Sequence, residues 1–207
     1  MGVERFTSFD DFQPNRVIGG GISRPLKVGE VSACRAILPI ADSLLVLQRS
    51  FAREVETSVG PERGVGLAIP LAYHATVNGE QLDHTHLTLI RGNTPVHVIE
   101  EHANTYLMLR LDSDMRDVGW PEFDKGLTVI RPDRVSLRHL QATVLDIFRW
   151  ASTCVDPKEF YELQQSMHET LRAALDNALI ADRFARPGSF AKYQRLVRQL
   201  DEIGRVK

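Results

Sequence analysis

The chain of 207 residues is long enough for one or two domains, and its 43% hydrophobic and 25% charged residues are ordinary for a globular protein. A formal net charge of -2 excludes a strong overall attraction to nucleic acid or to an acidic membrane. No apolar run is long enough to span a membrane, and the polar start lacks the apolar stretch of a signal peptide. With only two cysteines, a cytoplasmic protein with reduced thiols is the default expectation.

In chain order, residues 1–15 are expected to form a loosely held lead-in whose phenylalanines can dock on a later surface. From Val17 to Leu111, short alternating or apolar segments are broken by Gly, Pro and Asn, which is typical of strands. The expected strands cover 31–40, 44–47, 64–69, 73–77, 85–90, 96–100 and 105–111. Asn78-Gly79 predicts a hairpin turn, because both residues tolerate the positive φ of a type I′ turn. Many short strands joined by turns predict a β-barrel or jelly roll.

The pattern changes near Arg131, after which apolar residues recur at helical spacing. Ser136 is the expected N-cap of a first helix, and Asp156-Pro157-Lys158-Glu159 predicts the start of a second. The short connection between them predicts antiparallel neighbours. Arg186-Pro187-Gly188 ends the pattern, and Ser189 opens a third helix. A strand-rich half followed by helices predicts two parts rather than one mixed core.

Asp83-His84-Thr85-His86 is the strongest candidate for a metal site. Two histidines one residue apart in a regular strand point to the same side and can hold one metal ion. Metal-binding cupin barrels use such a pair with a Glu a few residues later, whereas Leu87–Ile90 follow here. We therefore expect no metal and no cofactor. A small cupin-type metalloenzyme that uses His84 and His86 stays open as an alternative.

Other patterns do not predict catalysis. Gly19-Gly20-Gly21 is followed by Pro25 and by no helix, so it does not form a phosphate loop. No G-x-S-x-G nucleophile elbow occurs. We expect no catalytic residues and no enzymatic activity. The polar side chains of the strand-rich half that can orient a ligand are Arg35, His84, His86 and Tyr106.

The order of these elements resembles the N-terminal half of AraC-type bacterial transcription regulators. The resemblance rests on the segment Arg5–Phe12, the strand-rich region with its Asn78-Gly79 turn, the helix pair, and the basic helix that begins near Tyr193. It implies a mainly β then α fold, with a cupin-like jelly-roll barrel, an antiparallel helix pair and a third C-terminal helix. The implied units are a sensor barrel with an N-terminal arm (1–131), a helical dimerisation hairpin (132–186) and the start of a linker helix (187–207).

The same resemblance implies a ligand-sensing and dimerisation domain that binds a small organic effector and forms a homodimer. The apolar stripe of the second helix is the expected dimer interface, with Leu163, Met167, Leu171 and Leu175. DNA would be bound only through a helix-turn-helix module absent from these 207 residues, which are then a fragment or a shortened relative. A homodimeric scaffold without a ligand is a further alternative.

Overall fold

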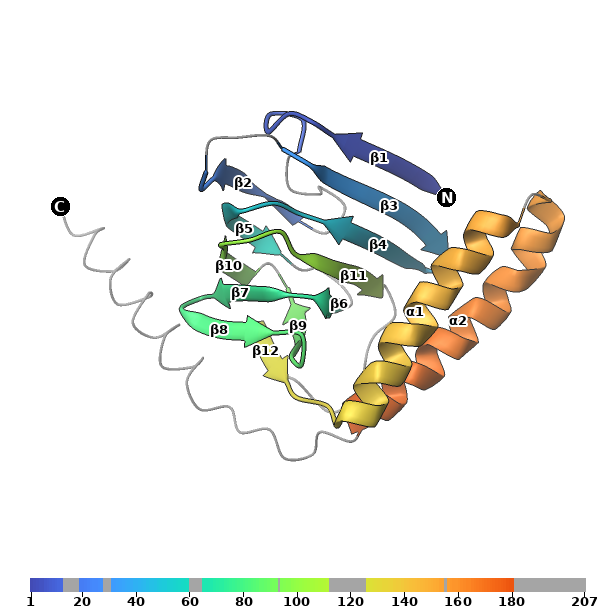
Figure 1. Cartoon of the computed structure of the whole chain (residues 1–207). Coiled ribbons are helices and arrows are strands. Elements are labelled where there is room, and N and C mark those ends of the chain that lie inside the picture. The colour runs from blue at the N-terminus through green and yellow to red at the C-terminus, as the bar shows by residue number, and fades with distance from the viewer. Residues whose placement is uncertain are drawn as a thin grey trace.

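The computed structural model describes residues 1–12, 19–27, 31–59, 65–92, 94–111, 126–154 and 156–180, and these form two antiparallel sheets and two helices (Figure 1). The larger sheet has the strand order β1 (Gly2–Phe6), β3 (Ala33–Ile40), β4 (Ser43–Arg49), β11 (Thr105–Leu111), β6 (Val65–Ala72), β9 (Leu87–Arg91) and β12 (Gly126–Ile130). The smaller sheet has the order β2 (Gly19–Pro25), β5 (Arg53–Val59), β10 (Thr94–Glu100), β7 (His74–Val77) and β8 (Glu80–Asp83). The predicted mainly β architecture is confirmed.

The central strands of the larger sheet are buried on both faces. Consecutive residues of a strand point to opposite faces, and the neighbours Leu45 and Val46 of β4 are both fully buried. The smaller sheet covers one face, where Val96 of β10 packs with Ile90 of β9 and Leu127 of β12. Helices α1 (Arg134–Thr153) and α2 (Pro157–Ile180) cover the other face. The larger sheet is therefore the middle of three layers.

The largest apolar core lies between the helices and the larger sheet. It contains buried residues of both, including Leu107 and Leu109 of β11, Leu140 of α1 and Leu171 of α2. Figure 1 shows the α1–α2 hairpin lying along one side of the strand-rich part. The expectation of two parts without a mixed core is therefore wrong. The helical stripes bury their apolar side chains against the sheet, because this removes both apolar surfaces from water at once.

Local signals in the sequence place the hairpin turn and the second helix correctly. Asn78 and Gly79 join β7 to β8 with φ values of 49° and 84°, as a type I′ turn requires. Asp156 caps α2, and its carboxylate accepts a hydrogen bond from the Lys158 N–H at 2.9 Å. The third helix, expected from Ser189, lies outside the described residues.

The first helix begins earlier than the sequence predicted. Asp133, rather than Ser136, is the N-cap of α1. Its Oδ1 atom accepts hydrogen bonds from the N–H groups of Val135 at 2.9 Å and Ser136 at 3.0 Å. The aspartate two residues after Arg131 therefore provides the stronger cap, and the helix gains most of a turn.

Five strands lie outside the seven expected segments: β1, β2, β5, β8 and β12. Residues Gly2–Phe6, part of the expected loose lead-in, form β1 and pair with β3 from Gly2↔Ile37 to Phe6↔Ala33. Arg53–Val59 forms β5 and pairs with both β2 and β10. Pairing uses backbone groups, so polar side chains on one face do not prevent it. None of the helices in the described ranges is both long and apolar enough to cross a membrane.

The shared core allows a direct test. Leu140→Ala removes a fully buried side chain of α1 from the contact with the sheet. We expect the free energy of unfolding to fall by about 2–5 kcal/mol, because lost burial and a residual cavity both destabilise the fold. Urea denaturation followed by circular dichroism measures this. Val135→Ala on the same helix is the control, since Val135 is 77% exposed and should change stability by less than about 0.5 kcal/mol. Equal effects of the two variants would contradict the shared core.

Candidate functional site

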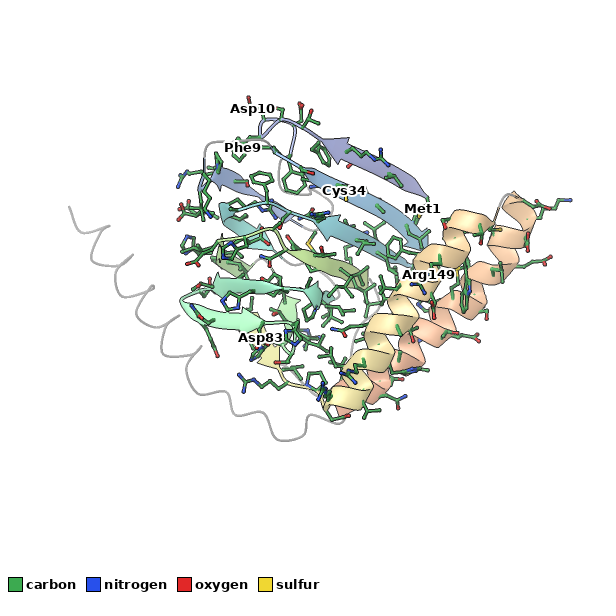
Figure 2. All side chains as sticks on the ribbon, viewed as in Figure 1. Met1, Phe9, Asp10, Cys34, Asp83 and Arg149 are labelled. Atoms are coloured by element: carbon green, nitrogen blue, oxygen red, sulfur yellow. The ribbon has the colours of Figure 1, made fainter. Side chains whose placement is uncertain are left out.

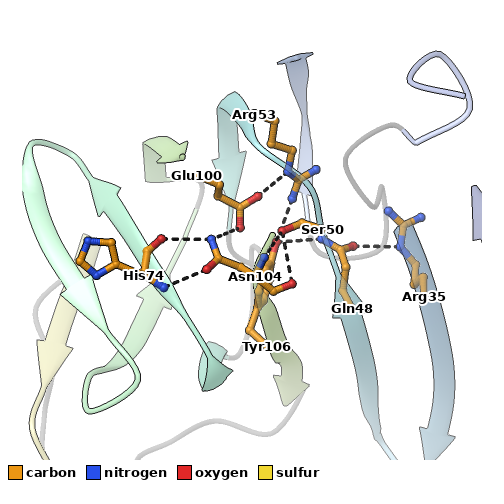
Figure 3. A network of polar contacts seen from close by, with 8 residues as sticks. All are labelled: Arg35, Gln48, Ser50, Arg53, His74, Glu100, Asn104 and Tyr106. Carbon is orange, nitrogen blue, oxygen red and sulfur yellow. Dashed lines mark hydrogen bonds and ion pairs between the residues drawn. The ribbon is translucent and has the colours of Figure 1, made fainter. Parts of the chain in front are cut away.

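A network of polar side chains lies between the two sheets (Figure 3). Arg35, Gln48 and Tyr106 stand side by side on the larger sheet, because the register pairs Arg35 with Gln48 and Gln48 with Tyr106. Arg53 and Glu100 are paired in the same way on the smaller sheet. The antiparallel register thus brings residues from β3, β4, β11, β5 and β10 to one place.

Hydrogen bonds join these five residues into a continuous chain. Arg35 Nε donates to Gln48 Oε1 at 3.1 Å, and Gln48 Nε2 donates to the Tyr106 hydroxyl at 2.8 Å. Arg53 Nη2 donates to the same hydroxyl at 2.8 Å. Arg53 Nε donates to Glu100 Oε2 at 2.5 Å, in a salt bridge. The Tyr106 hydroxyl therefore connects the larger sheet to the smaller one.

Asn104 extends the network to the neighbouring backbone. Its Nδ2 donates to Glu100 Oε1 at 3.3 Å and to the His74 carbonyl at 3.2 Å. Its Oδ1 accepts from the His74 N–H at 2.8 Å, and its own carbonyl accepts from the Ser50 N–H at 2.8 Å. The start of β7 and the connection between β4 and β5 are held in this way.

The ionisable groups of the network are almost fully removed from water. Arg53 and Glu100 are 4% and 1% exposed. Burial, together with the negative charge of Glu100, raises the pKa of Tyr106 to about 12, so its hydroxyl stays neutral at physiological pH. Burial lowers the pKa of Arg35, but a guanidinium stays protonated in proteins. The five residues therefore carry two positive charges and one negative charge.

Aromatic side chains cover the two guanidinium groups. The Arg53 guanidinium carbon lies 4.8 Å from the ring centre of Phe12, and that of Arg35 lies 5.2 Å from it. Phe12 is fully buried and also packs against Phe6 and Phe51. Figure 2 shows Phe9 of the same segment at the end of the strand-rich part farthest from the helices. The N-terminal segment therefore closes this end of the network, with cation–π contacts that strengthen when desolvated.

Two of the four predicted ligand-binding residues come together, and two do not. Arg35 and Tyr106 belong to the network and are joined through Gln48. His84 and His86 lie in the turn between β8 and β9, so the regular strand expected over 85–90 is wrong at its start. His84 is exposed and His86 is buried, and they share no face.

The Asp83 side chain explains this turn. Its Oδ1 accepts hydrogen bonds from the Thr85 N–H at 2.8 Å and from the Thr85 hydroxyl at 2.6 Å, which is the geometry of an Asx turn. Although desolvation acts in the opposite direction, the hydrogen bonds from Thr85 and His86 lower the pKa of Asp83 to about 2. Because these hydrogen bonds bend the backbone after Asp83, the side chains that follow no longer alternate between two faces as they would in a regular strand.

His86 has a hydrogen-bond partner on each ring nitrogen. Its Nδ1 lies 2.8 Å from Asp83 Oδ1, and its Nε2 accepts a hydrogen bond from Arg131 Nε. The lone pair of Nε2 therefore points at a guanidinium that precedes α1. A metal ion at this nitrogen would have to displace the positively charged Arg131.

The described residues contain one other group that can hold a metal. This group lies on the outer face of the smaller sheet and consists of Glu54, Glu56 and His97. Each residue offers one ligand atom, and the three atoms lie within 4.8 Å of one another. His97 Nε2 lies 2.7 Å from Glu54 Oε1, and Arg24 forms a salt bridge with Glu56 at 3.4 Å. The guanidinium of Arg24 beside these ligands disfavours a second cation.

The predicted interface residues of the second helix face inward. Met167, Leu171 and Leu175 are each 1% exposed and belong to the core against the larger sheet, and half-buried Leu163 packs on its edge. Exposed aromatic residues lie elsewhere on the hairpin: Trp150 of α1 is 49% exposed and Tyr161 of α2 is 77% exposed. Dimerisation itself stays a prediction.

Most residues of the network have no signal in the sequence. Arg53 and Glu100 are 47 residues apart, Gln48 directly follows the apolar residues 44–47 of β4, and Asn104 follows β10. Only strand pairing brings them together. The one local signal is Gln48 at the end of the apolar residues 44–47 of β4, a polar side chain that needs a polar neighbour if it is buried.

The buried ion pair gives the second prediction. Glu100→Gln leaves the Arg53 guanidinium buried without its carboxylate, and we expect the free energy of unfolding to fall by about 3–5 kcal/mol. Asp146→Asn is the matched control, because it removes the partner of Arg149 in an exposed pair worth about 0–1 kcal/mol. Urea denaturation of both variants gives the comparison. A loss at Glu100 as small as that at Asp146 would mean that the pair does not hold the interior together.

Comparisons with known proteins place the fold. No protein-family model and no curated protein matches the chain. The AraC-like transcriptional activator CuxR is similar in structure, with a TM-score of 0.61 and 12% identity over 95% of this chain and 78% of that one. Two further structures are less similar. A putative ethanolamine utilization protein of Salmonella typhimurium LT2 has a TM-score of 0.31, at 9% identity over 46% of this chain and 97% of that one. Protein Ylba of E. coli has a TM-score of 0.38, at 11% identity over 61% of this chain and 60% of that one. The chain thus shares the fold of CuxR over most of its length.

Proposed function

We propose that this chain is the effector-sensing part of a transcription regulator of the AraC type, and that it binds a small organic molecule between its two sheets. The observation that carries the proposal is the fold likeness to CuxR over 95% of the chain. The buried polar network supplies the kind of site that such a role needs, because convergent hydrogen-bonding groups in an otherwise apolar interior orient a ligand.

The composition of the network supports binding rather than catalysis. Its side chains are two arginines, a glutamate, a tyrosine, a glutamine, an asparagine and a serine, while His74 contributes only its backbone. The Ser50 hydroxyl contacts only the Asn104 backbone among the described residues. Nucleophilic catalysis would need a nucleophile with an adjacent base, and none of these pairs provides one. His86, one of the two histidines of the alternative metalloenzyme, is held by Asp83 and Arg131, neither of which belongs to the network. We therefore favour a sensor over an enzyme.

The contacts of β3 suggest how binding reaches the helices. Arg35 lies in β3, and Pro39 at the other end of the same strand accepts a hydrogen bond from Gln164 of α2 at 3.4 Å. Asp42, in the turn after β3, lies 3.1 Å from His168 of α2. An effector that binds more tightly when β3 is in one of two positions would favour the hairpin position that goes with it. The free energy of this shift cannot exceed the difference between the two binding free energies.

A thermal-shift screen tests effector binding. Sugars, amino alcohols, organic acids and aromatic metabolites are each added in excess, and a ligand at a hundred times its dissociation constant should stabilise the fold by about 2.7 kcal/mol. Gln48→Leu should weaken the shift produced by any hit, because it breaks the link between Arg35 and Tyr106. Exposed Gln81→Leu is the control and should leave the shift unchanged. A silent screen would remove the basis for a sensor.

We further propose that two copies associate through the exposed faces of the helical hairpin. Sedimentation at a protein concentration of tens of micromolar should show a dimer, because even a modest interface is populated in this concentration range. The double variant Trp150→Glu and Tyr161→Glu should be monomeric and remain folded, because both side chains are exposed. Ile22→Glu, on the outer face of the smaller sheet, is the control and should stay dimeric. A monomeric wild-type chain would contradict the proposal.

A further inference from the structure

Three side chains with metal-binding atoms lie together on the outer face of the smaller sheet. Glu54 and Glu56 are two residues apart in β5 and therefore point to the same side of the strand. His97 of β10 is paired directly with Glu56, so its side chain points to this side as well. β5 and β10 are neighbours inside the sheet, between β2 on one side and β7 on the other. Strand pairing thus places two carboxylates and one imidazole at a fixed point of the fold.

The distances among these groups suit one metal ion. His97 Nε2 lies 2.7 Å from Glu54 Oε1, and the ligand atoms of all three residues lie within 4.8 Å of one another. Atoms bound to one zinc ion at roughly 2.0–2.2 Å stand about 3–4 Å apart, so small rotations bring the three side chains into range. The side chains of Glu54, Glu56 and His97 are 30%, 52% and 35% exposed. They are therefore free to turn, and water can fill the remaining coordination positions.

The histidine is held in place from its other side. The His97 N–H donates to Asn78 Oδ1 at 2.7 Å, and the His97 carbonyl accepts from the Asn78 N–H at 2.8 Å. Asn78 itself belongs to the tight turn between β7 and β8. A ligand with a fixed backbone loses little freedom when an ion binds, and this favours binding.

Arg24 competes with a metal ion at this place but does not exclude one. Its guanidinium lies 3.4 Å from Glu56 Oε1, and both side chains are half exposed. Such exposed ion pairs contribute little to stability, so an ion can displace the arginine into water. The carboxylates of Glu54 and Glu56 carry two negative charges, of which Arg24 balances one. No other Arg or Lys of the described ranges forms a salt bridge with either carboxylate.

We infer that Glu54, Glu56 and His97 bind one divalent transition-metal ion. Zinc matches the set best, because it accepts both imidazole and carboxylate ligands, whereas magnesium and calcium prefer oxygen atoms alone. The ion joins β5 to β10 on the outer face, opposite the inner face where Arg53 and Glu100 join the same two strands. This role is structural and does not depend on the proposed effector.

A zinc titration of the untagged full chain by calorimetry, after removal of metals with a chelator, tests the site. His97→Ala and Glu54→Gln should each weaken the tightest zinc at least tenfold, because each removes one of three protein ligands. His102→Ala and Glu101→Gln are the matched controls, since both side chains are exposed and lie outside the group. These two variants should bind zinc as the wild type does.

Arg24→Ala distinguishes this site from other zinc-binding groups on the surface. Removal of the competing guanidinium should tighten zinc by about two- to fivefold, the equivalent of an exposed salt bridge. Magnesium in place of zinc should bind at least a hundredfold more weakly, because it prefers oxygen ligands to imidazole.

Paramagnetic cobalt locates the ion by NMR. Cobalt should shift or broaden the amide signals of β5 and β10 first, and this effect should be lost in His97→Ala. Zinc binding that is absent from the wild type, or unchanged in both His97→Ala and Glu54→Gln, would overturn the site. Cobalt effects centred on other strands would overturn it as well. Weaker zinc binding in Arg24→Ala would show that the ion does not use Glu56, which is incompatible with the three ligands.

Discussion

The ion pair of Arg53 and Glu100 is the interaction on which the interior depends. Both groups lie between the sheets with almost no exposure to water, and a charge in such a place persists only with an opposite charge and further hydrogen bonds. Tyr106 and Asn104 supply those bonds, and through Gln48 the chain of contacts reaches Arg35. Because each of these polar side chains is hydrogen-bonded to the next, the positions of the side chains from five strands depend on one another.

The position of the larger sheet explains why such a network forms on one side only. The sheet has an apolar face toward the helices, where leucines from β3, β4, β6, β9 and β11 meet the stripes of α1 and α2. Its other face is mixed. Beneath β7 and β8 it is apolar, where Ile90 and Leu127 pack with Val77 and Leu82, while the residues beneath β5 are polar. The interior therefore combines an apolar region with a charged one.

The N-terminal segment completes this arrangement. β1 extends the larger sheet by pairing with β3, and the residues after it bring Phe12 over Arg35 and Arg53. The aromatic ring excludes water from the guanidinium faces while leaving their edges to hydrogen bonds. Fold and site are thus built by the same elements: β3 pairs with the arm, carries Arg35, and ends beside α2.

The sequence by itself determined the features that a few neighbouring residues decide. Asn78-Gly79 dictates its turn because positive φ is a local cost, and Asp156-Pro157 begins a helix because the cap and the fixed φ act within one turn. Helical periodicity also identified both hairpin helices. Periodicity could not show what covers the apolar stripe of α2, because leucines such as Leu171 and Leu175 pack equally well against a sheet or against a partner chain.

The tertiary structure alone decided the site. Arg35 and Tyr106 stood out as polar residues in strands, but Arg53 and Glu100, which complete the network, are separated by 47 residues and meet only through the register of β5 with β10. His84 and His86 failed as a pair because one aspartate turned the backbone between them. Strand register depends on the packing of whole sheets, and a hydrogen bond between distant strands has no local signature in the chain.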